Sequence, residues 1–144
     1  MGQKVHPTGF RLGISTEYTS KWYAGNKDYS SYLLEDYRIR EYLKKQLENA
    51  SVSKIVIERP TKEAVVNIYT SRPGIVIGKK GEDIEKFRNK IASILNTDKA
   101  TVKVNVKEIK KPELDAQLVA EGITQQLELS LIHISEPTRL LSIA

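Results

Sequence analysis

The fold of this chain is decided by one stretch, Arg72-Pro-Gly-Ile-Val-Ile-Gly-Lys-Lys-Gly-Glu-Asp-Ile-Glu-Lys86. In it, Gly78 and Gly81 bracket two lysines, after a short apolar run and before a pattern with helical period. Because glycine has no Cβ, the main chain at these positions can adopt φ values forbidden to other residues and can approach a sugar-phosphate strand closely. A helix beginning at Glu82 would direct its free N–H groups toward the turn, where phosphate oxygens are favoured.

The spacing of the glycines separates this turn from the phosphate loops of nucleotide-binding enzymes. A P-loop has the pattern Gly-x-x-x-x-Gly-Lys-Ser/Thr, whereas Gly74 and Gly78 enclose three residues and Lys79 is followed by a second lysine. A dinucleotide-binding Gly-x-Gly-x-x-Gly would need glycine at position 76, which is valine. The remaining interpretation is the clamp loop of a KH domain, which holds about four nucleotides of single-stranded nucleic acid. A plain corner between two helices is the alternative.

On this interpretation we predict RNA contacts from the loop and from the cations at the two ends of the quoted stretch. The predicted contact residues are Gly78, Lys79, Lys80, Gly81, Arg72 and Lys86.

The composition indicates one modest domain with an anionic partner. Of the 144 residues 40% are hydrophobic, and 23 Lys and Arg residues exceed 18 Asp and Glu residues, which gives a net charge of +5. The chain has no cysteine, which excludes a disulfide framework and fits a reducing compartment. No apolar stretch approaches the roughly 20 residues of a membrane span, and the first residues lack the apolar core of a signal peptide. We therefore expect a cytoplasmic protein with no membrane partner.

Residues 1 to 27 show neither helical nor strand periodicity. They are rich in glycine, contain Trp22 and Tyr23, and carry four Lys and Arg residues against a single acidic residue, Glu17. Segments of this composition become ordered on an RNA surface, so we predict a basic RNA-binding arm. A flexible terminus is the alternative.

The next segment, residues 29 to 48, has apolar residues at helical spacing. Ile39, Leu43 and Leu47 form its expected core stripe, and Asp36 is placed to cap a second portion after a bend. Four tyrosines also lie in this helix, where packing against a sheet is favoured over a stacking platform for bases.

Strand and helix patterns alternate after this helix. Residues 52 to 59 and 64 to 71 are rich in Val and Ile and flank a polar turn, which predicts a β-hairpin. After the glycine turn, apolar residues at helical spacing from Ile84 to Ile94 predict a helix. Residues 101 to 107 alternate valine with Lys or Asn, so one face of that strand is buried and the other is basic.

A final helix is expected to open at Pro112. The resulting order is helix, strand, strand, short helix, helix, strand, with the glycine turn between the two adjacent helices. This is the order of the type II KH fold, an α+β fold whose three-stranded sheet is packed by helices. We place the arm at 1 to 27, the KH domain at 28 to 110 and the start of a linker helix at 111 to 128.

Four separated motifs then resemble one family. They are Met1-Gly-Gln-Lys-Val-His-Pro-Thr-Gly-Phe-Arg-Leu-Gly13, Ser51-Val-Ser-Lys-Ile-Val-Ile-Glu-Arg-Pro60, Arg72 to Asp83, and Lys111-Pro-Glu-Leu-Asp-Ala-Gln-Leu-Val-Ala120. Together they resemble the bacterial form of the third protein of the small ribosomal subunit, from Met1 to about Glu128. The resemblance implies a structural protein of the subunit head that binds 16S ribosomal RNA beside the messenger RNA entry, with messenger RNA and neighbouring head proteins as further partners. It also implies that Lys4, His6 and Arg11 contact ribosomal RNA.

The chain departs from this family after Glu128, where the family continues with basic residues and a second domain. Residues 129 to 144 instead resemble one reading frame of a sequencing adaptor, and we interpret them as an artefactual tail. Its β-prone run and Pro137 are expected to end the helix and leave the tail weakly packed.

The residues favour binding over catalysis. His6 and His133 are the only histidines, one in the arm and one in the tail, so we predict no catalytic residue, metal site, cofactor or small-molecule substrate. A free-standing KH module that binds single-stranded RNA, or the RNA-binding part of an enzyme, is the alternative function.

Overall fold

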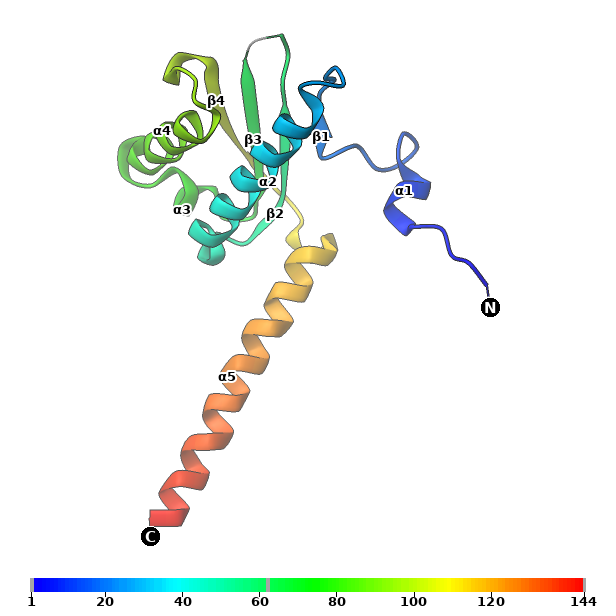
Figure 1. Ribbon diagram of the computed structural model, residues 1–144. Helices are drawn as coiled ribbons and strands as arrows, with labels where there is room; N and C mark the ends of the chain where they lie inside the picture. Colours follow the sequence, from blue (N-terminus) through cyan, green and yellow to red (C-terminus); the bar gives the residue numbers. More distant parts are fainter. Residues whose placement is uncertain (1, 62, 144) are drawn as a thin grey trace. The chain divides into compact units, whose positions relative to one another are not determined.

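The computed structural model describes residues 2 to 61 and 63 to 143, with side chains up to Leu131 (Figure 1). The chain forms two compact units, one up to Glu108 and the other from Ile109 onward.

The first unit is a four-stranded sheet with helices packed on one face. The strands are β1 (Ser20–Lys21), β2 (Val52–Glu58), β3 (Ala64–Thr70) and β4 (Val102–Glu108), in that order across the sheet. β2 and β3 form the predicted antiparallel hairpin, while β1 runs parallel to β2 and β4 runs parallel to β3. The helices of the packed layer are α2 (Tyr29–Gln46), α3 (Pro73–Ile77) and α4 (Glu82–Leu95), whereas the short helix α1 (Pro7–Arg11) lies in the arm and has no buried residue. From α2 to β4 the predicted order of helices and strands is confirmed, and α1 and β1 in the arm are additions to it.

Strand β1 is the departure from the expected three-stranded sheet. Two residues of the arm, Ser20 and Lys21, pair with Ile57 and Glu58, and Ile57 N–H donates to Thr19 O at 2.9 Å. A strand of two residues shows no alternation of polar and apolar side chains, so the sequence periodicity could not reveal it.

The core lies between the sheet and helices α2 and α4. Ile39 and Leu43 of α2 and Ile91 of α4 are fully buried against the inward side chains of β2 and β3, including Ile57 and Ile68. These are the stripes that the helical spacing predicts. Burial of such side chains stabilises each by roughly 1.5 to 3 kcal/mol relative to exposure, so the two stripes fix where the helices sit on the sheet.

Helix α2 is a single helix, which corrects one expectation. It runs without interruption from Tyr29 to Gln46, and Asp36 lies in its middle at 2% exposure. The expectation that Asp36 caps a second portion is therefore wrong. Its carboxylate is instead bonded to side chains of other segments.

The second unit is a single turn followed by a long helix. Pro112–Leu114 form a 3₁₀ turn, and α5 spans Ala116–Ile143. The expectation that the helix opens at Pro112 is therefore replaced by a start at Ala116, and the expected end before Pro137 is wrong. Leucine has a higher helix propensity than β-branched residues, so Leu129 and Leu131 favour continuation of the helix. No helix in the described part of the chain has the length and apolar character needed to cross a membrane.

Candidate nucleic-acid interface

The Gly78–Gly81 loop joins α3 to α4 and has an unusual backbone. Gly78, Lys80 and Gly81 all have positive φ, at 70°, 56° and 78°. Gly78 combines its φ with ψ −169°, a region that is essentially restricted to glycine. The expectation of glycine-only conformations therefore holds at Gly78, while Gly81 and Lys80 are left-handed.

Gly78 is also required because of its neighbour Asp83. A Cβ built on Gly78 would overlap the carboxylate of Asp83, whereas nothing lies within 4 Å of one built on Gly81. The acidic side chain in the first turn of α4 thus packs directly onto the glycine of the loop.

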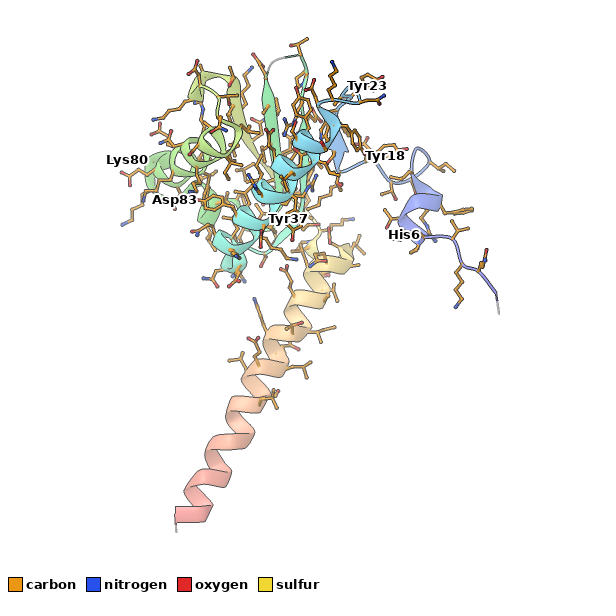
Figure 2. All side chains as sticks on the ribbon, in the orientation of Figure 1. His6, Tyr18, Tyr23, Tyr37, Lys80 and Asp83 are labelled. Carbon is orange, nitrogen blue, oxygen red and sulfur yellow. The ribbon has the colours of Figure 1, made fainter. Side chains whose placement is uncertain are left out.

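The lysines of the loop are available to a ligand. Lys79 and Lys80 are exposed, between the end of α3 and the start of α4, and Figure 2 shows Lys80 projecting from the protein surface. Lys86 lies one turn along α4 and is also exposed, and its Nζ is 4.0 Å from Asp83 Oδ1. The 14-residue helix α4 begins at Glu82, as expected, so the loop lies at its N-terminal end. Glu82, Asp83 and Glu85 place negative charge in the same turn.

The start of α3 is fixed by a buried threonine that the sequence did not single out. Thr70 Oγ1 donates to Ala50 O and accepts a hydrogen bond from Arg72 N–H at 3.1 Å. Arg72 is the N-cap residue of α3, and its side chain is exposed. Thr70 thus positions the backbone of a predicted contact residue.

Apolar surface lies next to the cationic loop. Val76 is fully buried, but Ile75 and Ile77 on either side of it are 48% and 38% exposed. Helix α3 therefore presents isoleucine side chains immediately before the glycine at which the phosphate-binding loop would begin.

The predicted contact residues of the arm lie on a different element. His6 caps α1, because its Nδ1 accepts a hydrogen bond from Gly9 N–H at 3.3 Å, and Arg11 NH1 donates to Pro7 O at 2.8 Å. Lys4 precedes this helix and is exposed. The side chains of His6 and Arg11 thus contribute to local structure, while all three remain at the surface.

The end of the arm is bound to α2 and to the end of β2 through a network of charged side chains. Trp22 Nε1 donates to Asp36 Oδ2 at 2.5 Å, and Arg59 NH2 donates to Asp36 Oδ1 at 2.8 Å. The same guanidinium pairs with Glu35 at 2.9 Å and lies 4.4 Å from the centre of the Tyr32 ring. This network joins the arm, α2 and the end of β2.

A second arginine of α2 reinforces the same attachment. Arg40 donates to Ile55 O at 2.6 Å, to Thr19 O at 2.9 Å and to Ser20 Oγ at 2.8 Å. Burial lowers the pKa of the Arg40 guanidinium, and Asp36 opposes that shift. Two of the three acceptors, Thr19 and Ser20, lie in the aperiodic arm, so periodicity could not indicate these contacts.

Within the described residues, three or more His, Asp or Glu side chains do not gather anywhere in a way that could hold a metal ion.

Comparison with protein families gives a match to the KH domain over residues 38 to 114. The chain belongs to the KH domain family. The match includes β2, β3, the Gly78–Gly81 loop and β4, so the predicted KH fold is confirmed.

Curated relatives of this KH chain are ribosomal proteins. It is 57% identical over 128 residues to the small ribosomal subunit protein uS3 of Paracidovorax citrulli, covering 89% of the chain and 43% of that protein. The uS3 proteins of Thiobacillus denitrificans and Burkholderia cenocepacia are 56% and 57% identical over the same length, with 53% and 47% of their length covered. The chain thus spans about half the length of these relatives, and the predicted resemblance to this ribosomal protein is confirmed.

Proposed function

We propose that this chain is an RNA-binding part of a structural protein of the small ribosomal subunit. The observation that carries the proposal is the loop between α3 and α4, in which two exposed lysines lie between glycines of positive φ. The similarity to proteins named uS3 supports the ribosomal setting. Binding, rather than catalysis, is the role of the loop.

The loop is suited to the backbone of single-stranded RNA. Gly78 and Gly81 allow close approach of a sugar-phosphate strand, while Lys79 and Lys80 supply charge to its phosphates. Ile75 and Ile77 add exposed apolar surface, on which bases can lie once their phosphates are held by the loop. Arg72 and Lys86 extend the cationic surface to either side.

The identity of the RNA and its place on the subunit follow from the resemblance to the ribosomal protein family. The RNA is 16S ribosomal RNA of the subunit head near the messenger RNA entry, with messenger RNA and neighbouring head proteins as additional partners. Lys4, His6 and Arg11 of the arm supply a second set of ribosomal RNA contacts, and the protein works on the ribosome in the cytoplasm.

Charge reversal in the loop tests this function. The variant K79D/K80D is compared with K44D/K45D, which makes the same charge change on the exposed end of α2. Binding of a single-stranded RNA oligonucleotide is measured by fluorescence anisotropy at several salt concentrations. The loop variant should bind more weakly and with a salt slope reduced by about 1.4, because each lost phosphate contact removes about 0.7.

Sedimentation separates the ribosomal role from a free-standing KH module. The wild-type chain should co-sediment with small subunits, and the loop variant should do so less. A native circular dichroism spectrum with unchanged RNA affinity in K79D/K80D would make the loop a structural corner, and binding to free oligonucleotides alone would favour the free-standing module.

A further inference from the structure

A row of three side chains crosses the sheet on the face turned away from α2 and α4. The strand register pairs Lys54 of β2 with Tyr69 of β3, and Tyr69 with Lys107 of β4. Side chains alternate between the two faces of a sheet, and the adjacent Ile55 and Ile68 are buried in the core. Lys54, Tyr69 and Lys107 therefore share the open face.

Tyr69 holds both lysines in place. Lys54 Nζ lies 4.7 Å and Lys107 Nζ 5.3 Å from the centre of its ring, distances at which an ammonium is attracted to an aromatic face. Lys107 Nζ also donates to the Tyr69 hydroxyl at 3.4 Å. Lys103 on the same strand differs, because its ammonium is paired with Glu63 at 2.9 Å.

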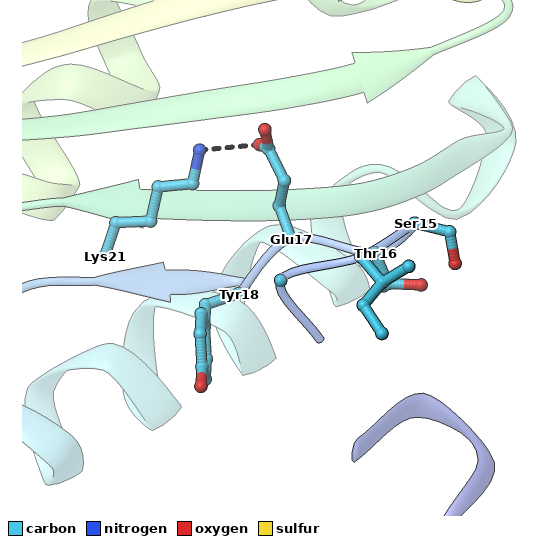
Figure 3. Close-up of a pocket in the computed structure, with 7 residues that line it drawn as sticks. Ser15, Thr16, Glu17, Tyr18 and Lys21 are labelled. Carbon is cyan, nitrogen blue, oxygen red and sulfur yellow. Dashed lines mark hydrogen bonds and ion pairs between the residues drawn. The ribbon is translucent and has the colours of Figure 1, made fainter. Parts of the chain in front are cut away.

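A third lysine and a carboxylate complete the cluster. Lys21 of β1 lies 2.7 Å from Glu17 and 3.9 Å from Glu58, and Figure 3 shows the contact with Glu17 beside an open hollow of the arm. The hydrogen bond from Lys21 lowers the pKa of the Glu17 carboxyl, and Lys54 and Lys107 lower it further. Lys21 pairs in register with Glu58, which lies four residues from Lys54 on β2, so Lys21 and its partner Glu17 are on the same face of the sheet as Lys54 and Lys107.

We propose that Lys21, Lys54 and Lys107 form a second RNA-binding surface, distinct from the Gly78–Gly81 loop, on which Glu17 takes the place of an RNA phosphate until RNA displaces it. Carboxylate and phosphate oxygens accept the same charge-assisted hydrogen bonds from an ammonium group. The Glu17 side chain is 74% exposed, so it is held weakly and can be displaced.

A polyanion fits this surface better than a folded protein partner. The apolar contribution of the next row is small, because Val56 there is 5% exposed. The accessible groups of this face are therefore polar or charged, and apart from the lysines and Tyr69 they include Asn105, Glu17 and Glu58. The chain also carries a net charge of +5. The inference rests on the proposed function only in taking RNA as the partner.

The test uses the full chain and two matched pairs of variants. K54A/K107A removes two cations from the open face, and K44A/K45A removes two from α2 as its control. E17Q removes the competing carboxylate, and E41Q is its control, because Glu41 forms a comparable exposed pair with Lys45 four residues later. Each variant is titrated with a single-stranded RNA oligonucleotide and with inorganic polyphosphate, in the wild-type and K79D/K80D backgrounds.

K54A/K107A and E17Q should change the affinity for RNA in opposite directions. K54A/K107A should weaken RNA binding severalfold in both backgrounds and reduce the salt slope by about 1.4, at about 0.7 per phosphate contact. E17Q should strengthen it by about two- to fivefold, the range expected for loss of an exposed ion pair. Polyphosphate should follow RNA, because the surface recognises phosphate.

Two results would overturn the proposal. The first is K54A/K107A binding RNA and polyphosphate as tightly as K44A/K45A, which would assign the face to a protein partner or to no ligand. The second is E17Q binding no more tightly than E41Q. Because both are read in the K79D/K80D background, failure of this surface is distinguishable from failure of the loop.

Discussion

Trp22, in the arm, donates its indole N–H to the carboxylate of Asp36, in the middle of α2, over 2.5 Å. Asp36 is 2% exposed and also accepts a hydrogen bond from Arg59. A buried carboxylate therefore joins the arm to α2 and to the residue that follows β2. A buried carboxylate is tolerated only when it is paired and hydrogen-bonded. The attachment of the arm and the stability of the domain are therefore linked.

Replacement of Asp36 by alanine should destabilise the protein strongly. The substitution leaves Glu35 as the carboxylate partner of Arg59 and leaves the Trp22 N–H without its acceptor. Breaking a buried ion pair costs about 3 to 5 kcal/mol, and the lower end applies because Glu35 remains. Urea denaturation followed by tryptophan fluorescence measures the loss. Asp28→Ala at the start of the same helix is the control, because that side chain makes no capping hydrogen bond, and equal losses in the two variants would contradict the role of Asp36.

Two truncations of the arm should have different effects. Removal of residues 1 to 18 leaves Thr19, Ser20 and Trp22 in place, so the free energy of unfolding should change by less than about 0.5 kcal/mol, as for changes at the surface. Removal of residues 1 to 27 takes away hydrogen-bond partners of Asp36 and Arg40, and should cost several times as much. Chemical denaturation of both shortened chains makes the comparison, and equal stability would show that the arm is separable at residue 27.

The loop could be predicted from the sequence, whereas the attachment of the arm could not. Gly78, Gly81 and the lysines between them are neighbours in the chain, so their types and spacing carry the information directly. Asp36 depends on Trp22 and Arg59, which lie 14 and 23 residues away, and nothing local indicates that pairing. The preference of aspartate for helix N-caps predicted a capping role for Asp36, but its hydrogen bonds to Trp22 and Arg59 hold it inside the helix instead.

The basic face of the sheet was likewise only partly predictable from the sequence. Alternation in residues 101 to 107 predicted that Lys103 and Lys107 would share one face, and the structure places them there. The contact of Lys107 with Tyr69 and Lys54 requires the register of three strands. That register is set by core packing of the whole sheet, which periodicity in one strand does not specify.

Replacement of Gly78 by alanine should damage the loop, while replacement of Gly74 should not. A Cβ at position 78 would overlap Asp83, and the backbone there costs about 1 to 3 kcal/mol for a residue other than glycine. Gly74, in α3, has nothing within 4 Å of an added Cβ and has no positive φ. Denaturation and RNA titration of both variants should give losses in G78A alone.

A double variant separates the two effects at Gly78. G78A/D83A removes the overlapping carboxylate and leaves the backbone cost, so it should recover part of the stability that G78A loses. Absence of any recovery would mean that backbone conformation accounts for the whole effect.

The Glu17–Lys21 contact should persist between two shifted pKa values. The pKa of Glu17 is lowered, chiefly by the hydrogen bond from Lys21, so the contact is fully formed above the ordinary carboxyl pKa and is lost as pH falls through the lowered value. The pKa of Lys21 is raised, chiefly by the hydrogen bond to Glu17, so the contact is lost in base as pH rises through that raised value. Carboxyl-detected NMR titration should find Glu17 below its ordinary pKa, and K21A should return it toward that value. An unchanged Glu17 pKa in K21A would contradict the contact.

Shortening the chain to end at Glu128 should leave the first unit intact. Helix α5 belongs to the second compact unit, so the core of the first does not depend on residues after Glu128. Leu129 and Leu131, in the middle of α5, are 58% and 66% exposed, and exposed apolar side chains of this kind favour self-association more than they stabilise a fold. The shortened chain should therefore unfold at the same urea concentration, bind RNA with the same affinity and remain monomeric to a higher protein concentration in analytical ultracentrifugation. A drop in the unfolding midpoint or in RNA affinity would instead make residues 129 to 144 a working part of the protein and would refute their interpretation as an artefactual tail.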